Sequence, residues 1–230
     1  MATKKAEVIE IKPIEMVQYK IRIVGDSPLI EHAWDEKAKR MILEGQKGTN
    51  KGKKKDPKNP VNDFVQSLYW MSEKPDVDCF TPEEEIEEKF VKAIQSGARF
   101  GFPIRGIKQA AISAAYRMGW SKDKASIRGA FFLKPVDEAD KTNTEMAIIE
   151  GDSPIMREDM VKIPGSADIR YRGQFTNWHT DLILEFNVNG QYSLENILNM
   201  INAGGYVCGL GEWRPERDGQ FGTFHVVTAE

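Results

Sequence analysis

Apolar and polar positions alternate near the start of the chain, over residues 17–24. Tyr19, Ile21 and Ile23 would lie on one face of an extended segment, with basic residues on the other. This period of two predicts a half-buried strand. The sequence Gly-Asp-Ser-Pro then ends the strand, and a helix is expected from about residue 35 to residue 43.

In the middle of the chain, apolar residues recur at helical spacing. Residues 81–96 begin with Thr-Pro-Glu-Glu, which favours Thr81 as the N-cap of an inserted acidic helix. A longer helix is predicted over residues 103–118, where Ile107 and Ala111 belong to an apolar stripe. Shorter elements are predicted as a helix over 63–71 and strands over 100–102, 129–133 and 146–149.

The C-terminal third has the clearest pattern. Residues 169–175 and 178–186 predict two strands joined by a tight turn near residues 176–177. Ser193 is expected to cap a helix that ends at Gly204-Gly205, followed by strands over 206–208 and 221–227. Together these elements predict one α+β domain over residues 1–230, with an antiparallel sheet and helices on one face.

Two segments interrupt this pattern and are expected to be mobile loops. Residues 45–60 contain six lysines together with glycine and proline, and residues 137–145 are polar. Over the whole chain, 40% of residues are hydrophobic and 29% are charged, which excludes collagen-like, disulfide-framework and wholly disordered proteins. The net charge is -3, so any attraction to a polyanion must come from local patches.

Cysteine and histidine usage limits the candidate chemistry. The two cysteines, Cys79 and Cys208, predict no disulfide framework, which fits a reducing compartment. With no apolar run near the roughly 20 residues of a membrane span and no secretory signal, a cytoplasmic protein without membrane contact is expected. The histidines show no zinc-type spacing, and the chain has no phosphate-loop or dinucleotide motif, so we expect neither metal nor cofactor.

Basic residues lie close to aromatic ones in two C-terminal segments, Arg-Tyr-Arg at 170–172 and Trp-Arg-Pro-Glu-Arg at 213–217. Aromatic side chains stack on unpaired bases while Arg and Lys neutralise phosphates, so the pattern favours single-stranded nucleic acid as a ligand. The candidate contacts are Arg170, Arg172, Trp213, Arg214 and Arg217, with Lys53, Lys54 and Lys55 of the basic loop adding diffuse attraction.

Three segments, in order along the chain, resemble the RAMP superfamily (repeat-associated mysterious proteins), which includes backbone subunits and guide-processing nucleases of CRISPR systems. They are the Ser-Pro-Leu-Ile step at 27–30, the helix start at 103–110 and the glycine-rich segment at 209–224. The chain also resembles uncharacterised phage and prophage proteins. The RAMP resemblance implies a modified ferredoxin-like (RRM-like) fold and side-by-side assembly along RNA. Lys108 would then reach a phosphate, and the glycines that would line the nucleic acid are Gly209, Gly211, Gly219 and Gly222.

Three functional hypotheses follow. The first is a non-catalytic protein that binds single-stranded nucleic acid, RNA before DNA, as an oligomer or filament. The second is a metal-independent endoribonuclease in which His32, just after the first strand, deprotonates a 2′-hydroxyl. The third is a phage interaction or inhibitor protein that engages a host or phage protein complex, because a basic loop and an acidic helix offer opposed patches.

Overall fold

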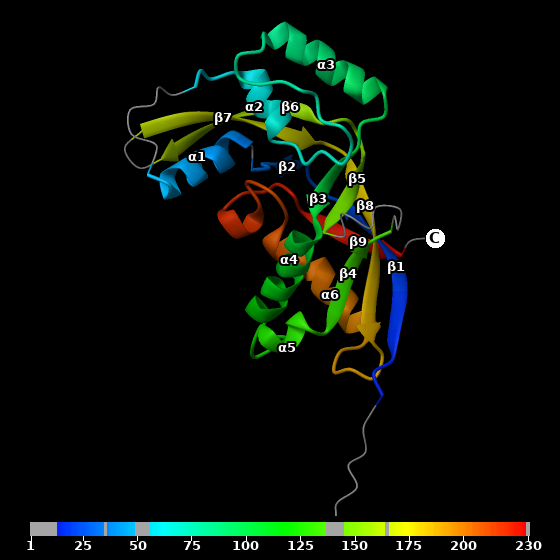
Figure 1. Ribbon diagram of the computed structural model, residues 1–230. Coiled ribbons are helices and arrows are strands. Elements are labelled where there is room, and N and C mark those ends of the chain that lie inside the picture. Colours follow the sequence, from blue (N-terminus) through cyan, green and yellow to red (C-terminus); the bar gives the residue numbers. More distant parts are fainter. Residues whose placement is uncertain (1–12, 35, 49–55, 137–144, 164–165, 229–230) are drawn as a thin grey trace, which may run out of the picture.

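The computed structural model describes residues 13–34, 36–48, 56–136, 145–163 and 166–228, which form an α+β arrangement around two antiparallel sheets (Figure 1). The expected contacts Lys53, Lys54 and Lys55 lie outside the described residues, as does almost all of the predicted loop at 137–145.

The larger sheet is built around its central strand, β8. Its strands are β1 (Met16–Gly25), β3 (Phe100–Pro103), β4 (Phe131–Pro135), β5 (Met146–Gly151), β8 (Trp178–Asn187) and β9 (Phe224–Thr228). One edge of β8 pairs with β1, and the other pairs with β5 at its start and with β4 further along. β9 then pairs with β1, and β3 pairs with β5.

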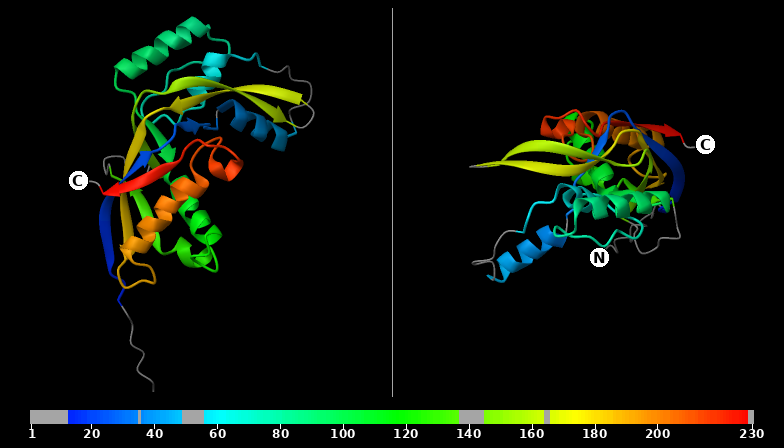
Figure 2. Two further views of the ribbon diagram at one scale, coloured as in Figure 1. Left: turned by 180° about the vertical axis from the view of Figure 1, so that it is seen from behind. Right: turned by 90° about the horizontal axis from the view of Figure 1, so that it is seen from above.

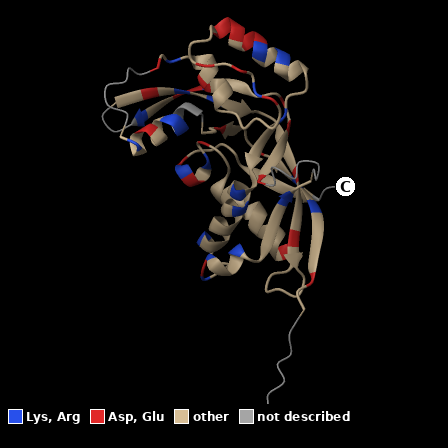
Figure 3. Cartoon of the chain, in the orientation of Figure 1, with Lys and Arg blue, Asp and Glu red and all other residues tan. Residues whose placement is uncertain are grey.

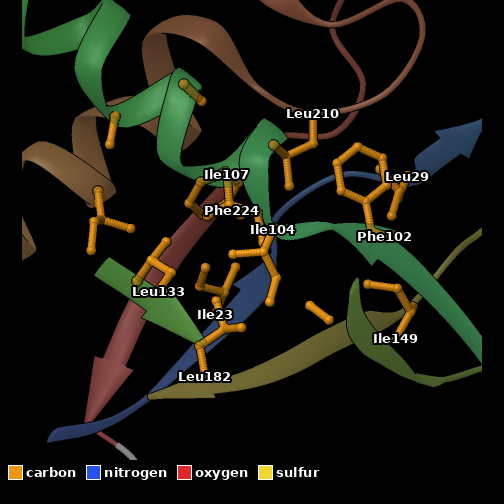
Figure 4. Close-up of a cluster of buried hydrophobic side chains, with 14 of the residues drawn as sticks. Ile23, Leu29, Phe102, Ile104, Ile107, Leu133, Ile149, Leu182, Leu210 and Phe224 are labelled. Atoms are coloured by element: carbon orange, nitrogen blue, oxygen red, sulfur yellow. The ribbon is translucent and has the colours of Figure 1, made fainter. Parts of the chain in front are cut away.

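Helices cover one face of this sheet, namely α4 (Ile104–Arg117), α5 (Ala125–Arg128) and α6 (Leu194–Ala203) (Figure 1). Along β8, buried and half-buried side chains alternate, so that Leu182 and its same-face neighbours point toward the helices. In the core, Ile23 and Leu182 from the sheet lie close to Ile107 of α4 and Phe224 of β9 (Figure 4). The alternation in the sequence therefore locates the main core correctly.

The opposite face of the larger sheet carries ion pairs between neighbouring strands. Asp181 of β8 lies 2.6 Å from Arg22 Nε and 2.9 Å from Lys20 Nζ, both on β1. Arg22, with Lys20, lowers the pKa of Asp181 to about 2. The polar residues of the period-two pattern therefore lie on the outer face of the sheet, where their charges pair with each other.

The smaller sheet has the order β2-β7-β6, with β2 (Leu29–Glu31), β6 (Ile155–Ile163) and β7 (Ser166–Phe175). β6 and β7 form a long hairpin that projects from the rest of the molecule (Figure 2). Helix α2 (Pro60–Gln66) packs on β7, where a Cβ on Gly173 would lie 2.1 Å from Leu68 Cδ2. Helix α3 (Glu83–Gln95) covers α2 through the rings of Phe90 and Phe64, whose centroids are 5.0 Å apart.

The predicted hairpin between residues 169–175 and 178–186 is wrong. Both strands exist, as β7 and β8, but they belong to different sheets and do not pair with each other. At Asn177 the chain leaves the smaller sheet, and buried Trp178 donates from Nε1 to the Ser27 carbonyl at 2.9 Å. The indole thus anchors the start of β8 beside the end of β1. Alternation identifies a strand but not its partner, because partners are distant in sequence.

The predicted helix stop at Gly204-Gly205 and the strand over 206–208 are also wrong. The chain continues from α6 into a π-helix, η1 (Gly204–Cys208), and leaves it at Gly209, where φ is 66°. A Cβ on Gly204 would lie 2.7 Å from Ala111 N, so this glycine lets the helix press against the backbone of α4. Gly204 is therefore needed for close packing between helices. A sequence pattern does not distinguish a glycine with this role from a glycine that ends a helix.

Several smaller expectations need correction. Thr81 does not cap α3: Pro82 holds the cap position, and Thr81 Oγ1 instead accepts from Asp78 N. The helix expected over 63–71 is α2, which ends at Gln66, and α1 (Glu36–Gln46) extends into the predicted basic loop. β2 and β6 were not predicted. By contrast, the expected β1, α4 and the Ser193-capped α6 are present, the last with a capping box to Asn196.

Candidate functional site

Three surface hollows share lining residues. The upper hollow, about 620 Å³, lies between residues 32–34, the middle of α1, α2 and β7. The central cleft, about 540 Å³, lies between α4 and the loop 209–217, and the basic hollow, about 490 Å³, lies on α4 and α5. His32 and Glu212 line both the upper hollow and the central cleft, and Gln109 lines both the central cleft and the basic hollow. We call these three hollows together the track.

Three carboxylates (Asp63, Asp168 and Glu212) and two cations (Lys58 and Arg170) line the upper hollow. Lys58 Nζ lies 2.8 Å from Asp168 Oδ1, and Arg170 Nε lies 3.8 Å from the other oxygen of Asp168. Lys58 lowers the pKa of Asp168. The predicted contact Arg170 therefore lines the track with its charge partly neutralised. Two aromatic residues, Trp34 and Tyr171, line the same hollow, and Trp34 is 67% exposed.

The glycines of the 209–222 segment are explained by packing within the chain. Gly211 has φ 70°, and a Cβ there would lie 2.2 Å from the Ile30 carbonyl oxygen. At Gly222, a Cβ would lie 1.9 Å from the Leu210 carbonyl oxygen. Gly209 and Gly211 line the central cleft and Gly222 does not, and both Gly209 and Gly222 are buried. The nucleic-acid contact expected at these glycines stays a prediction.

The other predicted residues of this segment differ in whether they line the central cleft. A Cβ on Gly219 would lie 1.7 Å from the Trp213 carbonyl oxygen, so this glycine closes the loop on itself. Trp213 is 37% exposed but is not among the residues that line the central cleft. Arg214 lines the cleft and binds Glu216 Oε2 at 3.2 Å and the Gly211 carbonyl at 2.8 Å. Arg217 lines the cleft as an exposed cation, with no ion pair to any described residue.

Arg172 is not available to a ligand, contrary to expectation. It is 1% exposed, and its guanidinium lies 3.1 Å from Asp159 on β6 and 3.4 Å from Glu212 in the C-terminal loop. Asp159 also pairs with Arg157 at 2.9 Å. Arg172 thus joins both strands of the projecting hairpin to the loop that forms the central cleft.

His32 has an acidic partner that sequence reasoning missed. Its Nδ1 lies 3.7 Å from Glu212 Oε1 at the junction of the upper hollow and the central cleft. His32 lowers the pKa of Glu212, and Arg172 adds to the effect while burial opposes it. Because His32 and Glu212 are 180 positions apart, no local motif pairs them.

Beside this pair lies a fully buried carboxyl group, that of Glu31. Its Oε2 accepts from Tyr69 N at 3.1 Å, and its Oε1 has no hydrogen-bond partner among the described residues. Burial raises the pKa of Glu31 well above its ordinary value. Burial, Glu31 and Glu212 also raise the pKa of Tyr69, which lines the central cleft.

The basic hollow holds four cations, and no acidic side chain lines it. Lys108, one of the predicted contacts, lies here with its Nζ 4.6 Å from the centre of the Phe132 ring, and burial lowers the pKa of this lysine. Sequence reasoning missed the other three, Arg105, Lys124 and Arg128. Arg105 precedes Lys108 by three residues on α4, and Lys124 precedes Arg128 by four, which is the spacing of neighbours on one helix face.

Figure 3 shows basic residues on α4 and α5, and acidic residues gathered on α3 at the far end of the molecule. In the described segments, no group of three or more His, Cys, Asp or Glu side chains is placed to hold a metal ion. Nor does any described helix combine the length and apolar composition needed to cross a membrane. Neither the known family models nor the curated protein sequences give a match to this chain.

Replacing Arg172 tests its role as a structural cation. Arg172→Ala leaves the buried carboxylate of Asp159 without this partner, so we expect the free energy of unfolding to fall by about 3–5 kcal/mol. Urea denaturation followed by circular dichroism measures this. Arg170→Ala is the matched control on the same strand, and its effect should stay within about 0.5 kcal/mol. Equal effects of the two variants would contradict the role given to Arg172.

The carboxyl of Glu31 predicts a pH dependence of stability. Its pKa in the folded protein lies above the ordinary value of 4.5, so the folded state holds the proton more tightly than the unfolded state. The contribution of Glu31 to stability therefore falls as pH rises above about 4.5. In Glu31→Gln, the free energy of unfolding should depend less steeply on pH from there toward neutrality. Exposed Glu73→Gln should keep the wild-type slope, and an unchanged slope in Glu31→Gln would refute the assignment.

Proposed function

We propose that this protein binds single-stranded nucleic acid, RNA in preference to DNA, along the track, without cleaving it. The observation that carries the proposal is the basic hollow, which is lined by four cations, two of them exposed and two half-buried, and by no carboxylate. A polyphosphate backbone is the ligand that such a surface attracts, because each phosphate contact releases counterions. Arg217 extends this free charge into the central cleft.

The aromatic residues of the track favour an unpaired strand over a duplex. Exposed Trp34 and half-buried Tyr171 line the upper hollow, and half-buried Tyr69 lines the central cleft. Aromatic faces of this kind stack on bases that are not already stacked in a helix. A strand lying along the track would therefore meet phosphate-binding groups on α4 and α5 and stacking groups further along.

The order of the elements in the larger sheet supports a modified ferredoxin-like arrangement. β1, α4, the pair β4 and β5, β8, α6 and β9 follow the order β-α-β-β-α-β, with β2 to β3 inserted after β1, α5 after α4, and β6 and β7 between β5 and β8. The modified ferredoxin-like fold and the relationship to the RAMP superfamily are therefore part of the proposal.

Side-by-side assembly along the strand belongs to the same proposal. Within the described residues, β6 pairs only with β7, so it leaves one edge open for pairing with another copy. If copies line up along one strand, the mass of the complex should rise in steps as the oligonucleotide lengthens.

Fluorescence anisotropy with labelled single-stranded RNA and DNA tests the proposal. We expect binding at low salt, with RNA bound more tightly than DNA of the same sequence. The double variant Arg105→Ala with Arg128→Ala should bind more weakly, and the slope of log affinity against log salt should become shallower by about 1.4 for two lost contacts.

The matched control is Lys89→Ala with Lys92→Ala, which removes the same charge from α3, away from α4 and α5 (Figure 3). This control should retain the wild-type slope. Absence of binding at low salt, or equal losses in both double variants, would refute the proposal.

One observation favours a second function, metal-independent endoribonuclease activity: the pairing of His32 with Glu212 in the central cleft. The imidazole would take the proton of a 2′-hydroxyl, whose oxygen attacks the neighbouring phosphorus and expels the 5′-oxygen. Glu212 would orient the ring. Arg117 and Arg214 line the same cleft, and each is paired with Glu216.

Incubating hairpin RNA with the protein in EDTA tests this second function. Cleavage that His32→Ala abolishes and Glu212→Gln slows would support it. His225→Ala is the control, because His225 is also partly exposed and paired with a carboxylate, Asp26, at 2.7 Å. Intact RNA, or cleavage that survives in His32→Ala, would remove this function.

A further inference from the structure

A fourth hollow, about 710 Å³, lies beyond α5 and is larger than any of the three hollows in the track. It is formed between the segment that follows α4, the start and outer face of α6, and η1. Every polar side chain that lines it is an amide or a phenol, and none carries a charge. The lining includes Trp120, Tyr192, Tyr206, Asn196, Asn199 and Asn202. We call it the amide-aromatic hollow.

Its aromatic side chains are exposed although they are large. Tyr206 is 82% exposed and Trp120 is 45% exposed. Tyr206 lies on η1, and single π-helical turns are rare and frequently occur at functional sites. The flanking glycines are fixed by the core, since a Cβ on Gly205 would lie 1.9 Å from the Phe224 carbonyl oxygen. The interior therefore accounts for Gly204 and Gly205 but gives no reason for a tyrosine at the exposed position that follows.

The asparagine amides of the hollow have N–H groups that could donate hydrogen bonds to a ligand. Asn196 Oδ1 accepts from the cap residue Ser193, and Asn202 Oδ1 accepts from Val226 N, so the amide group of each is oriented by the fold. The Nδ2 donors of both, and the whole amide of Asn199, have no hydrogen bond to another described residue. Oriented amides beside aromatic faces match the edges and faces of a nucleobase.

Helix α5 contacts the lining of this hollow and also contributes Arg128 to the basic hollow. Ser126 of α5 lies 3.4 Å, oxygen to oxygen, from Tyr192 of the amide-aromatic hollow. Lys124 and Arg128, immediately before α5 and at its end, line the basic hollow. A phosphate on one side of this single helical turn would leave the adjoining base free to reach the other side.

We propose that the amide-aromatic hollow is a stacking subsite for an unpaired nucleobase of the strand whose phosphates lie on the basic hollow. Trp120 and Tyr206 supply the stacking faces, and the asparagine amides bind the polar edge of the base. The subsite rests on the proposed function, and it adds the element that a phosphate surface lacks, a contact with the base itself.

The test compares two single strands with the same number of phosphates, one carrying bases and one abasic. For the strand with bases, Trp120→Ala and Tyr206→Ala should each weaken binding roughly 5- to 150-fold, the range for one stacked base. For the abasic strand, the variants and the wild type should bind alike. Phe80→Ala, which removes a 72% exposed aromatic ring near α3, is the matched control and should affect neither strand.

The outcomes separate the subsite from the proposed function. Binding that depends on Arg105 and Arg128 but not on Trp120 or Tyr206 would overturn the subsite alone. Equal losses for the two strands would also overturn it, because the aromatic rings would then act only through the fold. No binding of either strand at low salt would refute the proposed function and the subsite together.

A second arm addresses the other ligand class that aromatic and amide groups recognise, an oligosaccharide. Adenosine should quench the tryptophan fluorescence of the wild type more than that of Trp120→Phe, whereas a dextran oligosaccharide should quench both equally. If the oligosaccharide, rather than adenosine, quenched the wild type more than Trp120→Phe, the hollow would be an oligosaccharide site. This result would overturn the proposal.

Discussion

A buried guanidinium, that of Arg172, lies where the projecting hairpin, the smaller sheet and the C-terminal loop meet. A charge at this depth is stable only beside carboxylates, and Asp159 and Glu212 supply them from β6 and from the loop. Because Glu212 also faces His32, the same interaction fixes the junction between the upper hollow and the central cleft. The geometry of the track is therefore tied to one internal ion-pair network.

Charge along the track follows from where carboxylates are placed. In the upper hollow, Asp168 neutralises Lys58, and in the central cleft Glu216 binds Arg214 and Arg117. No acidic side chain lines the basic hollow, so attraction to an anion is concentrated on α4 and α5. The net charge of -3 hides this separation, because the acidic residues of α3 lie at the other end of the molecule (Figure 3).

Local patterns predicted the elements whose causes are local, and failed where the causes are distant. The alternation in β1 and the cap at Ser193 act within a few residues and were correctly predicted. Arg170 and Arg172 look alike in sequence, yet one is partly exposed and the other is buried. Only the fold brings Asp159 and Glu212 to the second of them, and the same holds for the pairing of His32 with Glu212.

The π-helix η1 shows how close packing in the core determines which residue is exposed at the surface. Gly204 and Gly205 are required because α4 and β9 leave no room for a Cβ at either position. The chain meets this constraint by widening the end of α6 into η1, which turns Tyr206 outward beside Trp120. A glycine pair that resembles a helix stop in sequence is, in the folded protein, what places an exposed aromatic ring at the mouth of a neutral hollow. Packing inside and the shape of the proposed subsite outside therefore depend on the same few residues.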